Sequence, residues 1–157
     1  MNQFGKNPPR SGGYGSGGKD SRPQPPSAKA REVKFFTDSE KKSINPDLLD
    51  RDAEAQAGQL HEQIGSAQLR RFFGEVKNLS LRLQQGRKWA ELEPFVRMVK
   101  SKAMYAKGRT NGAIPDEFRA FLTDNIDKIK DQRDFEAFAL YFEAVVGYMY
   151  GKGLVKK

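Results

Sequence analysis

The chain carries one strongly amphipathic helical pattern, and that pattern restricts its fold more than any other feature of the sequence. After Ser66 the apolar side chains recur every three or four residues, at Leu69, Phe72, Phe73, Val76, Leu79 and Leu83. At 100° per residue these six positions lie within about 120° of the helix circumference. Ser66 is a suitable N-cap, and the stretch 84–86 ends the pattern. A helix with one apolar face needs other elements to cover it.

Three later segments continue the helical pattern. In residues 88–107 the inward positions are Trp89, Leu92, Phe95, Val96, Val99 and Ala103, and Pro94 predicts a kink or a fresh helix start. Pro115 and Asp116 open a helix with one face made of Phe118, Phe121, Leu122, Ile126 and Ile129. The last helix, with Asp134 as its expected cap, ends at Gly151 and carries Phe135, Phe138, Ala139, Phe142, Val145, Val146 and Met149.

Ahead of these segments the helical signals are weaker. Pro46 is suited to the first turn of a short helix through about Ala57, and residues 58–65 are expected to form a connection. Thr37 and Glu40 have the spacing of a capping box. Strand signals are few and there is no repeat of fixed period. We therefore predict an all-α fold, a small helical bundle of about five helices over residues 35–157, with its core at 64–153.

Residues 1–34 have a different composition, rich in glycine, proline and serine. Such a segment cannot bury enough apolar surface to offset the entropy of ordering, so we expect a disordered arm. It is basic, with seven lysines and arginines against Asp20 and Glu32, and it holds +5 of the net charge of +8. A solubilising tail is favoured over a loose nucleic-acid-binding arm in which Phe4 and Tyr14 stack on bases.

The sequence argues against catalysis. There is no cysteine, and His61 is the one histidine among the 157 residues, so neither a zinc ligand set nor a nucleophilic triad can be written. No phosphate-binding loop motif occurs. We predict no enzymatic activity, no metal and no cofactor. No apolar run approaches the roughly 20 residues that span a bilayer, and the N-terminus lacks the apolar core of a signal peptide, so a cytoplasmic location is expected.

The basic residues of 94–115 have no acidic residue within that stretch. Helical lysines of soluble domains usually have carboxylates three or four residues away. Arg97 can pair with Glu93, but Lys100 and Lys102 have no such neighbour, and Arg109 follows in a glycine-flanked loop. These cations are predicted to be available for an external anion. Tyr105 shares the flank of Lys102. It would stack on bases if exposed, although a core position is favoured.

The helix that starts near Ser66 repeats this pattern. Arg71 has Glu75 four residues on, so a local ion pair is its expected role, whereas Arg70 and Lys77 have no local carboxylate. Gly74 lies between them on nearly the same line of the helix. A glycine there costs about 1 kcal/mol relative to alanine. Close approach of an external backbone and close packing against another helix both remain open as reasons for it.

Three segments together resemble a known family. They are Ile64–Phe72, which opens the basic helix, Val99–Arg109 with its alternating basic residues and tyrosine, and Phe135–Gly153 with its aromatic helix. In order and spacing they are similar to the small helical subunit of type III-A CRISPR effectors, the Csm complex. The long arm is not a usual part of that family, and Gly65 stands where the family usually has threonine.

The resemblance implies a non-catalytic subunit, present in several copies that stack in a filament beside other subunits of the effector complex. It also implies contact with guide and target RNA along the channel where they pair, without sequence readout and with no membrane involved. The RNA-binding positions carried over by the resemblance are Gln68, Arg70, Arg71, Lys77, Lys100, Lys102, Tyr105 and Arg109.

Two other functions stay open from the residues alone. One is a helical protein-interaction adaptor whose basic patches meet acidic surfaces of partners. The other is a general single-strand RNA binder that acts mainly through the basic arm.

Overall fold

The computed structural model describes Gly5, Pro9, residues 32–60 and residues 64–157, and it divides the chain into two units, Met1–Arg31 and Glu32–Lys157. The predicted arm over residues 1–34 lies almost wholly outside the described residues, so its disorder stays a prediction. The second unit consists of helices α1 (Pro46–Leu49), α2 (Arg51–Gln59), α3 (Ser66–Gln84), α4 (Trp89–Gly108), α5 (Asp116–Lys128) and α6 (Gln132–Gly151), with two short strands, β1 (Ile64–Gly65) and β2 (Val155–Lys156).

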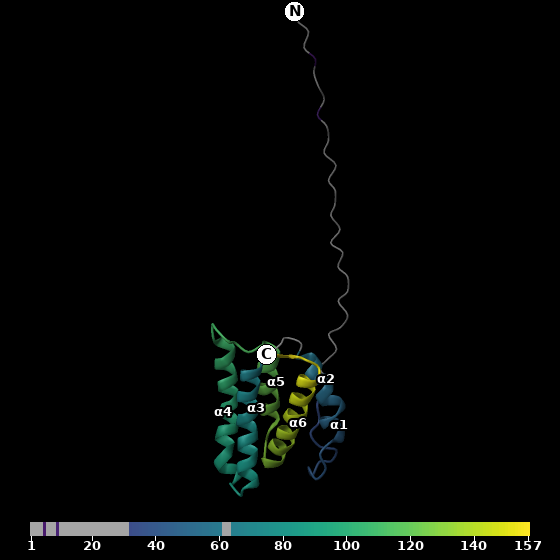
Figure 1. Cartoon of the computed structure of the whole chain (residues 1–157). Helices are drawn as coiled ribbons and strands as arrows, with labels where there is room; N and C mark the ends of the chain where they lie inside the picture. Colours follow the sequence, from purple (N-terminus) through teal and green to yellow (C-terminus); the bar gives the residue numbers. More distant parts are fainter. Residues whose placement is uncertain (1–4, 6–8, 10–31, 61–63) are drawn as a thin grey trace, which may run out of the picture. The chain divides into compact units, whose positions relative to one another are not determined.

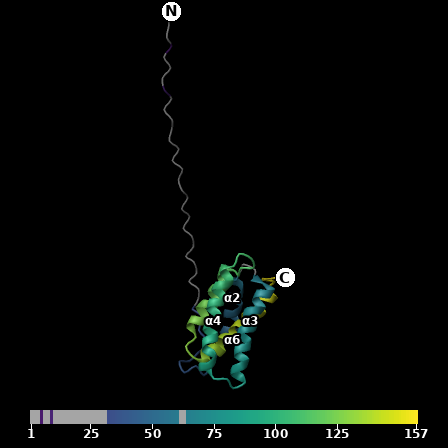
Figure 2. The same ribbon diagram turned by 90° about the vertical axis from the view of Figure 1, so that its left-hand side faces the viewer.

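The long helices run alongside one another as a bundle (Figures 1 and 2). Helix α4 packs against α3 on one side and α5 on the other, and α6 packs against α3 and α2. The predicted all-α bundle is confirmed.

A cluster of aromatic rings joins three of these helices. The ring of Phe142 on α6 lies 5.7 Å from Phe73 of α3, and 6.1 and 5.4 Å from Phe118 and Phe121 of α5. Phe138, one turn earlier on α6, stacks on Phe142 at 5.9 Å. Rings at these separations attract beyond the area that they bury. The expected apolar faces of α3, α5 and α6 all turn toward this cluster.

Several expected helix boundaries differ in the structure. Ser66 is the first residue of α3 and not its N-cap, which is Gly65 and makes no side-chain capping hydrogen bond. Helix α4 is continuous through Pro94, so no fresh helix begins there. Asp131, rather than Asp134, caps α6, because its side chain accepts the backbone N–H of Asp134 at 3.0 Å. The expected helix from Pro46 to about Ala57 is divided at Asp50, whose backbone leaves the helical region, so the described part of the chain has six helices rather than about five.

The capping-box spacing of Thr37 and Glu40 does not start a helix. The segment forms a tight loop closed by a bridge between Phe36 and Ile44. Asp38 accepts the backbone N–H groups of Lys42 and Ser43 at 3.0 and 2.9 Å. The side chain therefore stabilises a turn of the kind that competes with helix.

The burial of two aromatic residues differs from, or was not part of, the sequence expectations. Phe95, expected inward, is 49% exposed, because it lies at the edge of the apolar face of α4 and no further helix covers that edge in the described unit. Tyr141, for which the sequence made no prediction, is completely buried, and burial raises the pKa of its hydroxyl well above the ordinary value. Its hydroxyl has no hydrogen-bond partner among the described residues.

The C-terminus forms a strand that the sequence analysis missed. β2 pairs in parallel with β1, with Ile64 opposite Val155 and Gly65 opposite Lys156. This pairing places the last lysines at the start of α3. They lie at the same end of the bundle as the loop after α4 (Figure 1).

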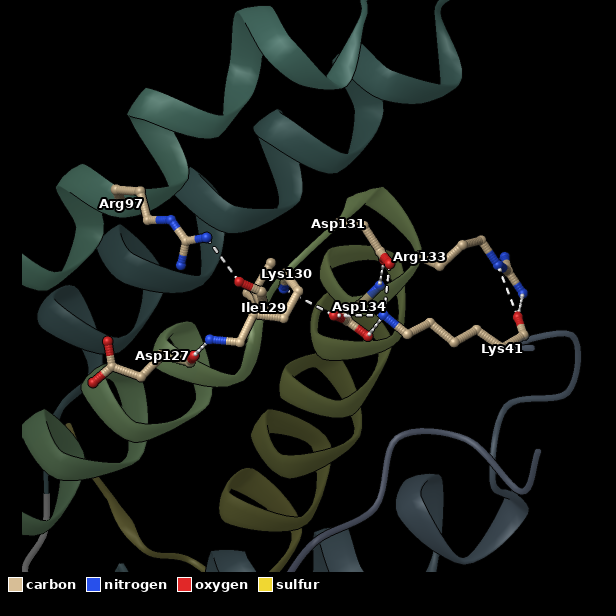
Figure 3. Close-up of polar contacts among 8 residues, drawn as sticks. All are labelled: Lys41, Arg97, Asp127, Ile129, Lys130, Asp131, Arg133 and Asp134. Atoms are coloured by element: carbon tan, nitrogen blue, oxygen red, sulfur yellow. Dashed lines mark hydrogen bonds and ion pairs between the residues drawn. The ribbon is translucent and has the colours of Figure 1, made fainter. Parts of the chain in front are cut away.

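Lys41 joins the loop before α1 to the start of α6 (Figure 3). Its Nζ lies 2.6 Å from the carboxylate of Asp131 and 2.9 Å from that of Asp134, which is 5% exposed. Arg133 donates two hydrogen bonds of 3.1 Å to the carbonyl oxygen of Lys41. These contacts stabilise the left-handed backbone of Lys41, whose φ is 57°. A buried carboxylate needs such partners to stay charged at low cost.

The Lys41 contacts predict an acid-sensitive contribution to stability. Desolvation alone would raise the pKa of Asp131, but hydrogen bonds from Lys41 and from the backbone of Asp134 bring it below 3.8. A carboxylate with a lowered folded-state pKa stabilises the fold above its unfolded pKa and loses that effect as pH falls through the folded value. The free energy of unfolding should therefore decline below about pH 4. In urea titrations, Asp131→Asn should lose less stability on acidification than the native chain. An equal loss in both proteins would contradict this.

The same contacts predict the effect of removing the lysine. Lys41→Met leaves the buried carboxylate of Asp134 without its cation and should cost roughly 1–3 kcal/mol at pH 7. Lys42→Met, at an exposed neighbour that pairs with Glu40, should change stability by less than about 1 kcal/mol.

Candidate nucleic-acid interface

Three of the lysines that were predicted to be available for an external anion form ion pairs with carboxylates of the same molecule. Lys77 Nζ lies 2.6 Å from Glu143 of α6, Lys100 pairs with Asp127 of α5, and Lys102 pairs with Glu75 of α3. The prediction that these cations lack carboxylate partners is therefore wrong. The sequence test looked three or four residues along each helix, and these partners lie 66, 27 and 27 residues away.

These three lysines also face different grooves. Lys77 points to α6, Lys100 to α5, and Lys102 to α3. The divergence of Lys100 and Lys102 follows from helix geometry, because two residues on one helix separate their side chains by about 200°. The eight residues carried over by the resemblance therefore include lysines directed toward three different helices.

The pairs themselves are weak, because they are partly exposed. The side chains of Lys77 and Glu143 are 54% and 48% exposed. Ion pairs of this kind contribute about 0–1 kcal/mol in water. A closely approaching polyanion can compete with single carboxylates for such lysines.

Arg71 and Arg97 have distinct roles. Glu75 is engaged by Lys102, so the expected Arg71–Glu75 pair does not form, and Arg71 is exposed with no ion pair in the described ranges. Arg97 pairs with Glu93 at 2.9 Å as expected. It also donates to the carbonyl oxygens of Ile126 and Ile129 at 3.0 and 2.7 Å, of which Figure 3 shows the second. Arg97 thus satisfies the C-terminal end of α5 and is committed to the fold.

Gln68 positions the loop after α4. Its Nε2 donates to the carbonyl oxygen of Gly112 at 2.7 Å, and Gly112 has a φ of 67°, where glycine is favoured. Its side chain is therefore already bonded within the chain, and it stabilises the loop that carries Arg109.

Tyr105 and Arg109 line a shallow cavity of about 470 Å³, together with Gly108, Thr110 and Asn111. Tyr105 is 69% exposed, so the favoured core position is wrong for this residue. Its ring is free to contact a planar ligand. Arg109 is exposed and forms no ion pair in the part of the chain that the structure describes. An aromatic ring beside an unpaired guanidinium is a typical arrangement for single-stranded nucleic acid.

Arg70 lies in a second cavity, at the junction of α3 with the C-terminal strand. Its neighbours there include Tyr150, Lys156 and Lys157, none of which the sequence analysis singled out. The Ser66 hydroxyl, and secondly Arg70, lower the pKa of Tyr150 below its ordinary value of 10.0. The sequence signal for this site was the Lys156–Lys157 pair, but its position depends on β-pairing between distant residues.

Gly74 lies on the open face of α3, between Arg70 and Lys77. A Cβ added there would meet no atom within 4 Å. Close packing against another helix of the described unit therefore does not explain this glycine, and approach by an external partner remains.

Other site types find little support. Among the described residues no group of three or more acidic or histidine side chains is arranged to hold a metal ion. None of the helices in the described ranges is long and apolar enough to cross a membrane. His61 lies outside those ranges.

The helical unit is similar to a known protein family. The family model described as Csm2 Type III-A matches residues 43–152, which is most of the helical unit. Neither a curated protein nor a solved structure matches the chain.

The open surface at Gly74 predicts a gain in stability on substitution. Gly74→Ala should raise the free energy of unfolding by about 1 kcal/mol, because alanine has less backbone entropy to lose in a helix. Gly86→Ala is the matched control and should destabilise, since Gly86 has a φ of 92°. Both are measured by urea denaturation of the isolated chain. Destabilisation by Gly74→Ala would show that the helix is contacted there within the molecule.

Proposed function

Because the chain belongs to the Csm2 Type III-A family, small subunits of type III-A CRISPR effector complexes, we propose that it lines the channel where guide and target RNA pair. In this role it contacts the RNA backbone and takes no part in cleavage. An effector complex that pairs guide with target RNA acts in the cytoplasm, where we place the chain.

The exposed cations without carboxylate partners carry this proposal. Arg70, Arg71 and Arg109 are exposed, and none of them forms an ion pair with another described residue. Arginine matches phosphate geometry well and is weakly hydrated. Guide pairing supplies sequence specificity in such effectors, so a subunit beside the duplex needs phosphate contacts and a fitting shape. Tyr105 adds a ring for an unpaired base.

The paired lysines contribute less to RNA binding than the unpaired arginines. Lys77, Lys100 and Lys102 exchange their carboxylates for phosphates as RNA approaches, since each ion pair contributes little in water. The phosphates of an RNA strand form a closely spaced series of negative charges, whereas each of these lysines is paired with a single carboxylate. Each exchange still has to displace an existing partner, so these lysines contribute less affinity than the free arginines.

An exposed apolar stripe on α4 supports contact with other proteins of the complex. Phe95 and Met98 are 49% and 47% exposed on adjacent turns. Neighbouring subunits, including further copies of this chain in a filament, would cover them. An adaptor without RNA contact is the alternative, which the next experiment separates.

Removing free arginines should weaken RNA binding and reduce its salt dependence. Arg71→Ala with Arg109→Ala should lower the affinity for single-stranded RNA about tenfold or more and flatten the slope of log K against log salt by about two units, one per lost contact. Fluorescence anisotropy at several salt concentrations measures both. The control, Lys42→Ala with Arg51→Ala, removes the same charge at cations paired with Glu40 and Asp47. If both double variants bind alike, the adaptor is favoured.

Removing the competing carboxylates should have the opposite effect. Glu143→Gln with Asp127→Asn frees Lys77 and Lys100, and should tighten RNA binding several-fold while steepening the salt slope by up to about two units. Glu40→Gln with Glu54→Gln removes the same negative charge from the pairs with Lys42 and Lys152. An unchanged slope in the first variant would mean that neither lysine contacts RNA.

A further inference from the structure

The cavity beside the C-terminal strand has the composition of an anion-binding pocket. Its volume is about 480 Å³, and its polar side chains are Ser66, Arg70, Tyr150, Lys156 and Lys157. None of the described residues that line it carries a carboxylate side chain. A carboxylate at the end of the chain would offset one of the three positive charges and still leave the wall positive.

The pocket is built by a definite backbone arrangement. α6 ends in a turn in which Lys152 and Leu154 donate to the carbonyl oxygens of Tyr148 and Met149, both at 2.9 Å. Gly153 adopts a φ of 67° there, as glycine commonly does after a helix. The chain then pairs with β1 at Ile64 and Gly65. This pairing positions Lys156 and Lys157 opposite Arg70, which lies on the first turns of α3.

The cations in the pocket lack ion-pair partners among the described residues, whereas a neighbouring lysine outside the pocket has one. Lys152, on the same turn, pairs with Glu54 at 3.0 Å. Arg70, Lys156 and Lys157 form no ion pair among the described residues. Ser66 begins α3, so the positive end of that helix dipole adds to the local field. Among the described residues, no side chain therefore compensates the positive charge of the pocket.

Tyr150 gives the pocket an apolar surface beside its charges. The ring is 45% exposed, and its hydroxyl lies 3.2 Å from the Ser66 hydroxyl. Rings at such positions stack on nucleobases, and hydroxyl pairs bond to sugar or phosphate oxygens. The volume is within the range of small-ligand pockets, about 300–1,000 Å³.

We propose that this pocket binds one unpaired nucleotide, with its phosphate held by Arg70, Lys156 and Lys157 and its base against Tyr150. This proposal adds detail to the proposed function. It rests on that function, because contact of the subunit with RNA is what brings a nucleotide to the pocket. It adds a discrete subsite, formed by the C-terminal strand, to the diffuse contacts of a subunit that follows a duplex. The nucleotide is one unit of an RNA strand or a free nucleotide, and both present the same chemistry.

The test compares triple variants of the full chain that lose equal charge. The first, Arg70→Gln, Lys156→Gln and Lys157→Gln, alters the pocket. The second, Arg71→Gln, Lys107→Gln and Arg109→Gln, alters exposed cations around the α3–α4 side and tests the proposed function. Each is titrated with uridine 5′-monophosphate, a short oligouridylate and an RNA duplex, by calorimetry and by NMR of the backbone amides of residues 153–157.

The pocket variant should lose about tenfold or more in affinity for the mononucleotide and the oligouridylate, which corresponds to about one strong charged contact. A control variant with the same charge loss at cations paired elsewhere, Lys42→Gln with Arg51→Gln and Arg87→Gln, should keep its mononucleotide affinity within about twofold. Tighter binding of oligouridylate than of mononucleotide would identify an RNA strand as the source, and equal binding would identify a free nucleotide. Equal weakening of mononucleotide binding in the pocket variant and in this control, or no effect of the pocket variant on any probe, would overturn the proposal. The proposed function fails separately, if the second variant binds oligouridylate and duplex like the native chain.

Tyr150 provides a second readout. Tyr150→Phe keeps the ring and should retain most oligouridylate affinity, whereas Tyr150→Leu should weaken it several-fold. Crosslinking of an oligonucleotide that contains 4-thiouridine should map to the peptide with Tyr150. Equal affinities of the two variants together with crosslinks elsewhere would exclude base stacking on this ring.

Discussion

The packing of aromatic rings around Phe142 is the interaction on which the rest of this structure depends. It holds α3, α5 and α6 together through Phe73, Phe118, Phe121 and Phe138. Once these faces are buried, the rotation of each helix about its axis is determined, because side-chain direction follows residue number at 100° per step. The positions of all charged side chains on the surface follow from that rotation, so the core decides which cations meet carboxylates and which remain free.

The packing of the core therefore determines how positive charge is distributed over the surface of the molecule. The helical unit carries a modest excess of positive charge, and many of its lysines are offset by acids of neighbouring helices. Described cations without an ion pair include arginines on the exposed side of α3, Arg109 in the loop after α4, and the lysines of the C-terminal strand. The ion pairs elsewhere are weak, so their lysines can exchange a carboxylate for another anion. A surface of this kind suits the role proposed for this member of the Csm2 Type III-A family, in which it assembles with other proteins and contacts RNA.

The helices were predictable because their signals are local. Apolar spacing identified α3, α5 and α6 together with most of their buried residues. Errors arose where an interaction outside the segment decided the outcome. The loop at 37–44 is stabilised by Asp38 and by contacts of Lys41 with α6, and Phe95 is exposed because no element covers its side of α4. The β1–β2 pair involves two residues from each strand, too few for any periodic signal.

By itself the sequence determined the all-helical class, the main apolar faces, the Glu93–Arg97 pair and the resemblance to the small subunit of type III-A effectors. Each of these depends on residues within a turn of one another, or on the order of such segments. Only the tertiary structure decided that Lys77, Lys100 and Lys102 are paired, that Tyr105 is exposed, and that Arg70 shares a pocket with Lys156 and Lys157. The physical reason is distance along the chain. Charge pairing and pocket formation depend on separation in space, and packing brings together residues that lie tens of positions apart.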